Sequence, residues 1–101
     1  MYLFFDVETV GFPKKWNRPH TDTFNWPRMV SIAFQRYGER RQHLESYEAI
    51  IQPEGFEIPI EAEQIHGIST EKAKEDGVPI EDALRAFAAA IDKADYIIAH
   101  N

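Results

Sequence analysis

The sequence predicts an α/β protein built on one mixed sheet. Three observations lead to this prediction. The chain begins with an apolar strand that runs out into a loop at Gly11. Two alternating strands separated by a turn at Gly38 come next, and an amphipathic helix over residues 79–93 directly precedes a short apolar strand over residues 95–99. A helix followed by an apolar strand is typical of a sheet with parallel neighbours, so we expect the last strand to be buried beside the first.

Length and composition limit the class of protein. The 101 residues suffice for one domain, and a hydrophobic fraction of 44% is that of a chain with a packed core. The absence of cysteine excludes a disulfide framework, a thiolate metal site and a cysteine nucleophile, and it fits a reducing compartment. The apolar start has no basic region before it and is interrupted by Asp6, so it is neither a signal peptide nor a membrane span. We therefore expect a cytoplasmic protein with no membrane partner.

Charge is distributed unevenly along the chain. The net charge of −6 argues against a protein that simply coats nucleic-acid phosphates. Residues 1–41 nevertheless carry seven Lys or Arg against four Asp or Glu, whereas residues 42–101 carry four against thirteen. A polyanionic ligand would have to approach the first part. Ordinary surface charge explains the same distribution equally well.

The first strand ends in two carboxylates, Asp6 and Glu8. Side chains alternate between the faces of a strand, so these two share one face while Val7 points to the other. Neighbouring carboxylates repel each other unless a cation neutralises them, and hard oxygen ligands favour Mg²⁺ or Mn²⁺. The pair therefore predicts half of a divalent-metal site, with a solvated strand end as the alternative. Glu61 and Glu63 have the same spacing but lie in a polar stretch, where surface exposure is the ordinary explanation.

A long loop over residues 12–27 follows this strand. Its three prolines prevent regular structure across most of it, and a loop of this length in a small domain is usually functional or mobile. Its basic side chains can meet phosphates, and its tryptophans can stack on bases or anchor the loop. We expect Trp26 to be an anchor and leave the role of Trp16 open. The basic residues are Lys14, Lys15, Arg18 and His20.

The middle of the chain predicts a hairpin of two strands, over residues 28–37 and 42–52. Val30, Ile32 and Phe34 share one face of the first of these strands.

Two short helices are expected between Ile58 and Glu75. Gly67 suits the end of the first, and Ser69 or Thr70 caps the second. The longer helix over residues 79–93 begins with Pro79, which suits a first turn. Its expected apolar stripe consists of Ile80, Ala83, Leu84, Phe87, Ala88 and Ile91.

Five segments together resemble a known family. Residues 4–11 resemble the first motif, F-D-x-E-T-T-G, of the DnaQ-like 3′–5′ exonucleases in the DEDD superfamily, which include the epsilon proofreading subunit of DNA polymerase III. Residues 25–33 resemble the second strand of a bacterial and phage subset of that family. Residues 51–55 and 65–69 match its I-x-P and I-H-G-I-[ST] segments, and residues 98–101 match the start of its second motif, A-H-N-x-x-F-D.

This resemblance implies an RNase H-like fold with sheet order 3-2-1-4-5. The chain would be truncated after the fourth strand, so that residues 1–101 form the N-terminal part of a single exonuclease domain without its C-terminal strand and helices. The third acid of the family lies just beyond Asn101, and the catalytic histidine and the fourth acid lie further on. We therefore expect this fragment to be inactive by itself.

The resemblance also implies an activity and a set of site residues. Two Mg²⁺ or Mn²⁺ ions would support release of nucleotides from a 3′ end, with Asp6 ligating both ions and Glu8 ligating one. His66 is expected near the terminal nucleotide. The alternative is that His66 is a histidine at a helix end that hydrogen-bonds its own backbone. Val10 departs from the family's common Thr, which removes a hydroxyl and leaves backbone contacts possible. The residues expected around the terminal nucleotide are Thr9, Val10, Gly11, His66 and Asn101.

The expected partner is a single-stranded or frayed nucleic-acid 3′ end, DNA in preference to RNA, with a polymerase as a protein partner. A second hypothesis is a non-catalytic nucleic-acid-binding or assembly module that keeps the first half of the fold. A missing fifth strand would leave an unpaired edge and apolar surface. We therefore predict a homo-oligomer that uses the strand over residues 95–99, the helix over residues 79–93, or both.

Overall fold

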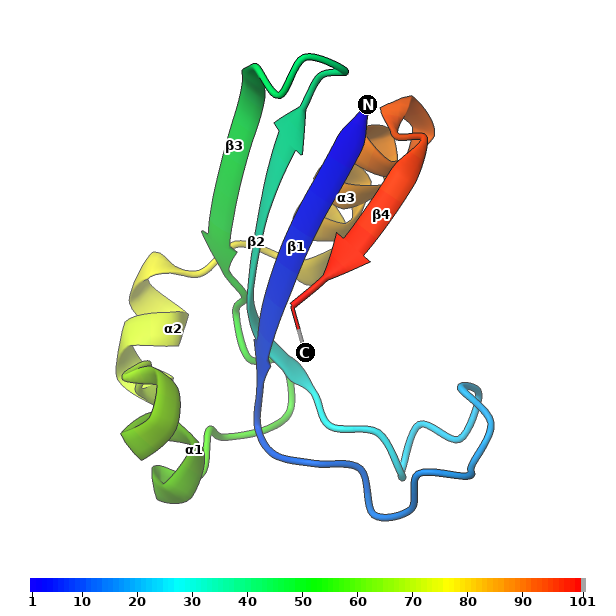
Figure 1. The fold of residues 1–101 in the computed structure, drawn as a ribbon. Coiled ribbons are helices and arrows are strands. Elements are labelled where there is room, and N and C mark those ends of the chain that lie inside the picture. Colours follow the sequence, from blue (N-terminus) through cyan, green and yellow to red (C-terminus); the bar gives the residue numbers. More distant parts are fainter. Residues whose placement is uncertain (101) are drawn as a thin grey trace.

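The computed structural model describes residues 1–100 (Figure 1). Its elements, in chain order, are β1 (Tyr2–Thr9), β2 (Met29–Tyr37), β3 (His43–Ile50), α1 (Ile60–His66), α2 (Thr70–Asp76), α3 (Ile80–Lys93) and β4 (Tyr96–Ala99). No helix in this part of the chain is both long and apolar enough to span a bilayer.

The four strands form one sheet in the order β3-β2-β1-β4. β1 and β2 are antiparallel, as are β2 and β3, whereas β4 runs parallel to β1. The predicted hairpin and the predicted mixed sheet are therefore confirmed, as is the implied order of the first four strands. The parallel pair requires a crossover, and α3 supplies it (Figure 1).

The core lies between the sheet and α3, which covers one face (Figure 1). Leu3 of β1 and Phe34 of β2 are almost fully buried there and pack with Ala90 of α3. Ile32, on the same face of β2, packs in a neighbouring cluster with Ala83. The predicted inward face of β2 is thus confirmed. The side chains of α3 at both contacts are alanines, which lets the helix axis approach the sheet closely.

The predicted apolar stripe of α3 is partly wrong. Leu84 is 44% exposed and Ala88 is also exposed, whereas Ala83 and Ala90 are buried. The helix is rotated so that its small residues, together with Phe87, face the strands. Periodicity identifies an apolar side of a helix, but the closest possible packing decides which residues at its margin are covered.

β4 departs from its predicted burial. It pairs with β1 as expected, with Leu3 opposite Ile97. Yet Tyr96, Ile97 and Ile98 are 60%, 49% and 37% exposed. β4 is an edge of the sheet that the structure describes, and within residues 1–100 nothing pairs with its outer side. The prediction of a buried strand is therefore wrong for these residues.

The short helix α1 ends, and α2 begins, as predicted. Gly67 has a φ of 77° at the end of α1, a left-handed conformation that glycine adopts without a steric cost. Ser69 caps α2, because its side chain accepts a hydrogen bond from the Lys72 N–H over 3.1 Å. Thr70, the other predicted cap, instead accepts from the Ile58 N–H over 2.9 Å and so ties α2 to the segment before α1.

β3 is shorter than the predicted strand because the chain changes partner at its end. Regular pairing stops at Ile50, and Ile51 then forms an isolated parallel bridge with Val78, just before α3. The Val78 N–H donates to the Ile50 carbonyl over 2.8 Å. This bridge fixes the start of the crossover helix relative to the sheet.

Candidate metal centre at the end of β1

Asp6 and Glu8 lie on the sheet face that α3 leaves open. Leu3, Phe5 and Val7 pack in the clusters under α3. Strand alternation therefore directs Phe4, Asp6 and Glu8 to the opposite face. That face carries no helix within residues 1–100 (Figure 1). Both carboxylates thus share one face near the C-terminal end of the strand.

The surroundings of the two carboxylates leave room for a ligand. Across the β1–β2 pair, Asp6 is opposite Ala33 and Glu8 is opposite Ser31, both small residues. The Asp6 side chain is 45% exposed. In the part of the chain that the structure describes, no arginine or lysine forms an ion pair with either acid. Their oxygens therefore remain accessible to a cation.

His100 is a site residue that the sequence reasoning did not single out. Its N–H donates to the Phe5 carbonyl over 2.9 Å, which extends the parallel ladder beyond Ala99. Its Nδ1 lies 3.7 Å from an Asp6 oxygen, a pairing that is ionic when the imidazole is protonated. The position of His100 directly after the last strand could have indicated this, because the carboxyl ends of neighbouring parallel strands meet at one edge of a sheet.

The turn after β1 holds three of the predicted nucleotide-contacting residues. The register shifts between Glu8 and Thr9, where the pairing with β2 is irregular. The Thr9 hydroxyl donates to the Gly11 carbonyl over 2.7 Å. The Val10 N–H donates to the Arg28 carbonyl over 3.0 Å. The Val10 side chain packs against a cluster formed by Val30, Ile58, Ala62 and Ala73. Val10 is thus partly buried, and the nucleotide contacts of this turn stay a prediction.

His66 is the last residue of α1, and its side chain forms a hydrogen bond with the backbone just after the helix. Its Nδ1 accepts a hydrogen bond from the Ile68 N–H over 3.1 Å, which is the alternative considered for it. Its Nε2 is buried and has no partner within residues 1–100. A place at the nucleotide pocket remains a prediction for this residue. Asn101 lies outside the described residues.

The two carboxylates suit Mg²⁺ or Mn²⁺ because both ions prefer oxygen ligands. Within residues 1–100, however, no three His, Asp or Glu side chains come together as a complete metal-binding group. That Asp6 and Glu8 form half of a metal site therefore stays a prediction. Glu61 and Glu63 have the same spacing, but they lie on the helix α1, where residues two apart do not face each other. The strand is what places the first pair on one face.

The fold and the paired carboxylates define a nuclease-type α/β domain, and a family model agrees. The model RNase_T, whose description is "Exonuclease", matches residues 3–101. The chain therefore belongs to this exonuclease family, which confirms the resemblance to the DnaQ-like branch of the DEDD superfamily.

The solved structures most like this chain include two exonucleases I. Exonuclease I of E. coli, in complex with a 5cy-dA13 oligonucleotide, is 19% identical with a TM-score of 0.76, and the alignment covers 99% of this chain and 20% of that one. A moderately thermophilic Exonuclease I from Methylocaldum szegediense is 18% identical, with the same TM-score and the same coverage. No curated protein matches. The neighbours confirm the RNase H-like fold, and this chain spans 20% of their length.

Proposed function

We propose that this chain is the N-terminal part of a metal-dependent 3′–5′ exonuclease that hydrolyses phosphodiester bonds at single-stranded or frayed DNA 3′ ends. The observation that carries the proposal is the position of Asp6 and Glu8, which lie on the open face of β1 without an arginine or lysine partner within residues 1–100. Family membership supports nuclease chemistry. The dependence on metal, the 3′–5′ direction of degradation and the DNA substrate are what we propose beyond family membership.

The chain's own contribution to catalysis is to hold two carboxylates in place. β1 is hydrogen-bonded to β2 on one side and to β4 on the other, so the Asp6 backbone has little freedom. Such rigid support keeps ligand oxygens close to their working geometry. In the complete family site, bound divalent ions would supply an activated water and charge stabilisation for the leaving 3′ oxygen. Asp6 would contact both ions and Glu8 one.

The substrate proposal is DNA in preference to RNA. Its support is that Exonuclease I of E. coli has been solved with dA13 and dT13 oligonucleotides, although identity to those proteins is low. A DNA polymerase as partner and a cytoplasmic location extend the same proposal. Co-purification with polymerase subunits would test the partner, and fractionation of cells that express the tagged protein would test the location.

A metal titration tests the candidate centre directly. Mn²⁺ is paramagnetic and broadens NMR signals of nearby nuclei. We expect it to broaden the amide signals around Asp6 and Glu8, and we expect Asp6→Asn to remove most of that effect, because one of the two proposed carboxylate ligands is lost. The matched control is the double variant Glu61→Gln, Glu63→Gln, which removes an acid pair of equal spacing from α1. Broadening at β1 should survive in the control. Equal broadening in the wild type and in Asp6→Asn would refute the metal centre.

Nuclease activity of residues 1–101 alone is expected to be very low. The family site needs four acids, of which this stretch supplies Asp6 and Glu8. Loss of several kcal/mol of transition-state stabilisation is expected, and each ~1.4 kcal/mol changes the rate tenfold. The measurement is single-turnover cleavage of a 3′-labelled oligonucleotide with Mn²⁺. Robust cleavage that depends on Asp6 would show that two acids suffice or that another subunit supplies the rest.

A second candidate is a non-catalytic nucleic-acid-binding or assembly module. The observation that favours it is the exposed apolar surface of β4, where Tyr96, Ile97 and Ile98 reach solvent. Under this alternative, the chain would bind a DNA strand or a second copy equally well with and without divalent metal. Mn²⁺ broadening at Asp6 would separate the two candidates.

A further inference from the structure

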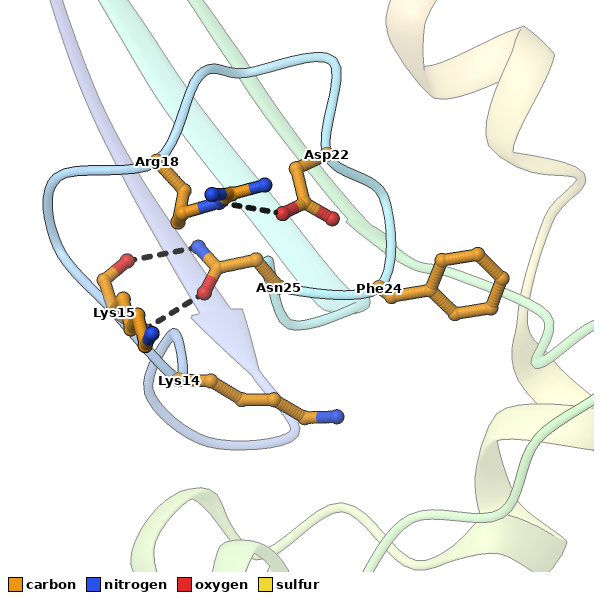
Figure 2. Close-up of a pocket in the computed structure, with 6 residues that line it drawn as sticks. All are labelled: Lys14, Lys15, Arg18, Asp22, Phe24 and Asn25. Carbon is orange, nitrogen blue, oxygen red and sulfur yellow. Dashed lines mark hydrogen bonds and ion pairs between the residues drawn. The ribbon is translucent and has the colours of Figure 1, made fainter.

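Residues 12–27, here called the β1–β2 loop, form a folded unit despite having no helix or strand. Asn25 is 6% exposed and lies at its centre (Figure 2). Its side-chain oxygen accepts from the Lys15 N–H over 2.7 Å, and its side-chain amide donates to the Lys15 carbonyl over 2.8 Å. The Lys14 N–H also donates to the Asn25 carbonyl, over 3.1 Å. These three bonds close the loop on itself before any ligand binds.

Trp26 forms a hydrogen bond within the loop, and its expected role as an anchor of the loop to the body of the domain stays a prediction. Its indole N–H donates to the Pro19 carbonyl over 2.8 Å, and the residue is only partly exposed. Arg18 pairs with Asp22 over 2.8 Å, which joins two more points of the loop. A loop fixed in this way loses less backbone entropy when its side chains bind a ligand.

The remaining side chains of the loop include two lysines that form no ion pair within residues 1–100. Lys14 and Lys15 line a pocket of about 230 Å³ together with Arg18 and Phe24 (Figure 2). Arg18 is neutralised by Asp22, whereas no ion pair engages Lys14 or Lys15 within the described part of the chain. The acidic helices α1 and α2 lie on the other side of the sheet end (Figure 1). The loop is thus locally positive in a chain whose net charge is −6.

The loop also exposes three large aromatic rings. Phe12, Trp16 and Phe24 are 82%, 73% and 88% exposed. The rings of Phe12 and Trp16 lie with centroids 6.5 Å apart, so they form one small aromatic surface. Exposed aromatics beside lysines are the combination that binds single-stranded nucleic acid, because bases stack on the rings while cations meet the phosphates.

The position of the loop relates it to the carboxylates. It begins directly after the turn that follows Glu8, at the end of β1 toward which β4 also points (Figure 1). We propose that the β1–β2 loop binds single-stranded DNA upstream of the 3′ end, with Lys14 and Lys15 on phosphates and Trp16 stacked on a base. This inference rests on the proposed function for the location of the 3′ end at Asp6 and Glu8.

The test measures binding without cleavage. Fluorescence anisotropy of a labelled dT13 oligonucleotide, of the length found with Exonuclease I of E. coli, is followed in EDTA. The double variant Lys14→Gln, Lys15→Gln should bind more weakly and should lower the slope of log K against log salt by about 1.4, because each lost phosphate contact to a single strand is worth about 0.7. Asn25 holds Lys15 through backbone atoms, so the loop keeps its bonds in this variant.

The matched control is Lys72→Gln, Lys74→Gln, which removes the same charge from the exposed surface of α2. Binding and salt slope should stay close to wild type. If the control weakens binding as much as the loop variant, the effect is one of total charge and the inference is overturned.

Trp16 provides an independent signal. Trp16→Ala should weaken dT13 binding about tenfold, since stacking of one base on an aromatic ring is worth that much or more. Quenching of tryptophan emission by dT13 should disappear in Trp16→Phe, which retains a stacking ring and leaves Trp26 in place. Quenching that persists in Trp16→Phe would place the strand elsewhere.

The outcomes separate this inference from the proposed function. Mn²⁺ broadening at Asp6 and Glu8 together with unchanged dT13 affinity in the loop variants would refute the loop site and leave the metal centre standing. Weakened binding in the loop variants without Mn²⁺ broadening would support the loop site and refute the metal centre. A wild-type chain that does not bind dT13 at low salt would overturn the inference outright.

Discussion

At the residue scale, backbone conformation determines what a given spacing means. Asp6 and Glu8 are two positions apart on a strand and therefore share a face, whereas Glu61 and Glu63, equally spaced on α1, do not. The sequence suggested this distinction through the apolar residues before Asp6 and through Gly11 after the pair. His100 joined the site through a strand pairing that begins more than ninety positions away in the chain, at Tyr2.

Arg41 is the residue at which the backbone is under local strain. Its φ of 62° is the one positive value among the non-glycine residues of the described chain. It lies in the β2–β3 turn, where the Gly38 N–H donates to the Gln42 carbonyl over 2.9 Å. A left-handed conformation costs an ordinary residue about 1–2 kcal/mol, a cost that glycine avoids.

Arg41→Gly is therefore expected to stabilise the protein by about 0.5 kcal/mol, because the strain it relieves exceeds the extra entropy of the unfolded chain. Urea unfolding followed by circular dichroism measures the change. Arg40→Gly, one position earlier at a negative φ, is the control and should lower the free energy of unfolding. If Arg41→Gly lowers the free energy of unfolding, the Arg41 side chain stabilises the fold by more than the backbone strain costs.

At the element scale, the connection between α2 and α3 is fixed by close contact with the end of β3. Gly77 follows α2, and a Cβ added there would lie 2.3 Å from the Ala73 carbonyl oxygen and 2.7 Å from the Gln52 nitrogen. Both are backbone atoms, which cannot move aside as a flexible side chain can. The same region contains the bridge between Ile51 and Val78. The absence of a side chain at Gly77 thus allows α3 to start beside the sheet.

Gly77→Ala is expected to destabilise the protein by about 1–3 kcal/mol, the range for a side chain forced into occupied space. Thermal unfolding gives the change in melting temperature. Gly11→Ala is the control, because no atom lies within 4 Å of the added Cβ at that position. Equal melting temperatures for both variants would contradict the close approach. The sequence reasoning marked Gly11 as the end of the first strand but did not single out Gly77, because the crowding at Gly77 comes in part from Ile51 and Gln52, more than twenty positions away in the chain.

At the scale of the whole molecule, one face of the sheet and the outer edge of β4 are open within residues 1–100. α3 covers a single face (Figure 1). On the opposite face, Phe4 is 44% exposed and the two acids are partly exposed. The Tyr2 and Tyr96 rings stack across β1 and β4, with centroids 5.3 Å apart. An exposed edge strand offers unpaired N–H and C=O groups to another chain. The predicted self-association therefore remains a prediction, with β4 as its expected contact.

We expect residues 1–101 to sediment as an oligomer at tens of micromolar. The double variant Ile97→Lys, Ile98→Lys should shift the protein toward the monomer, because charges on an edge strand oppose pairing. Leu44→Lys is the matched control, since Leu44 is 42% exposed on β3, the other edge strand. A compact wild-type monomer of 11.7 kDa would contradict self-association.

The sequence by itself determined the order of the elements, the apolar face of β2, the caps of α1 and α2, and the acid pair at the end of β1. Each of these follows from local patterns: alternation, a glycine with a left-handed φ, or a serine before a helix.

Tertiary structure alone decided the rotation of α3, the exposure of β4, the burial of Asn25 and the proximity of His100 to Asp6. Local periodicity shows which side of an element is apolar, but not what covers it or how closely. Those outcomes depend on pairings and packing between residues far apart in the chain, and only the folded arrangement brings these residues together.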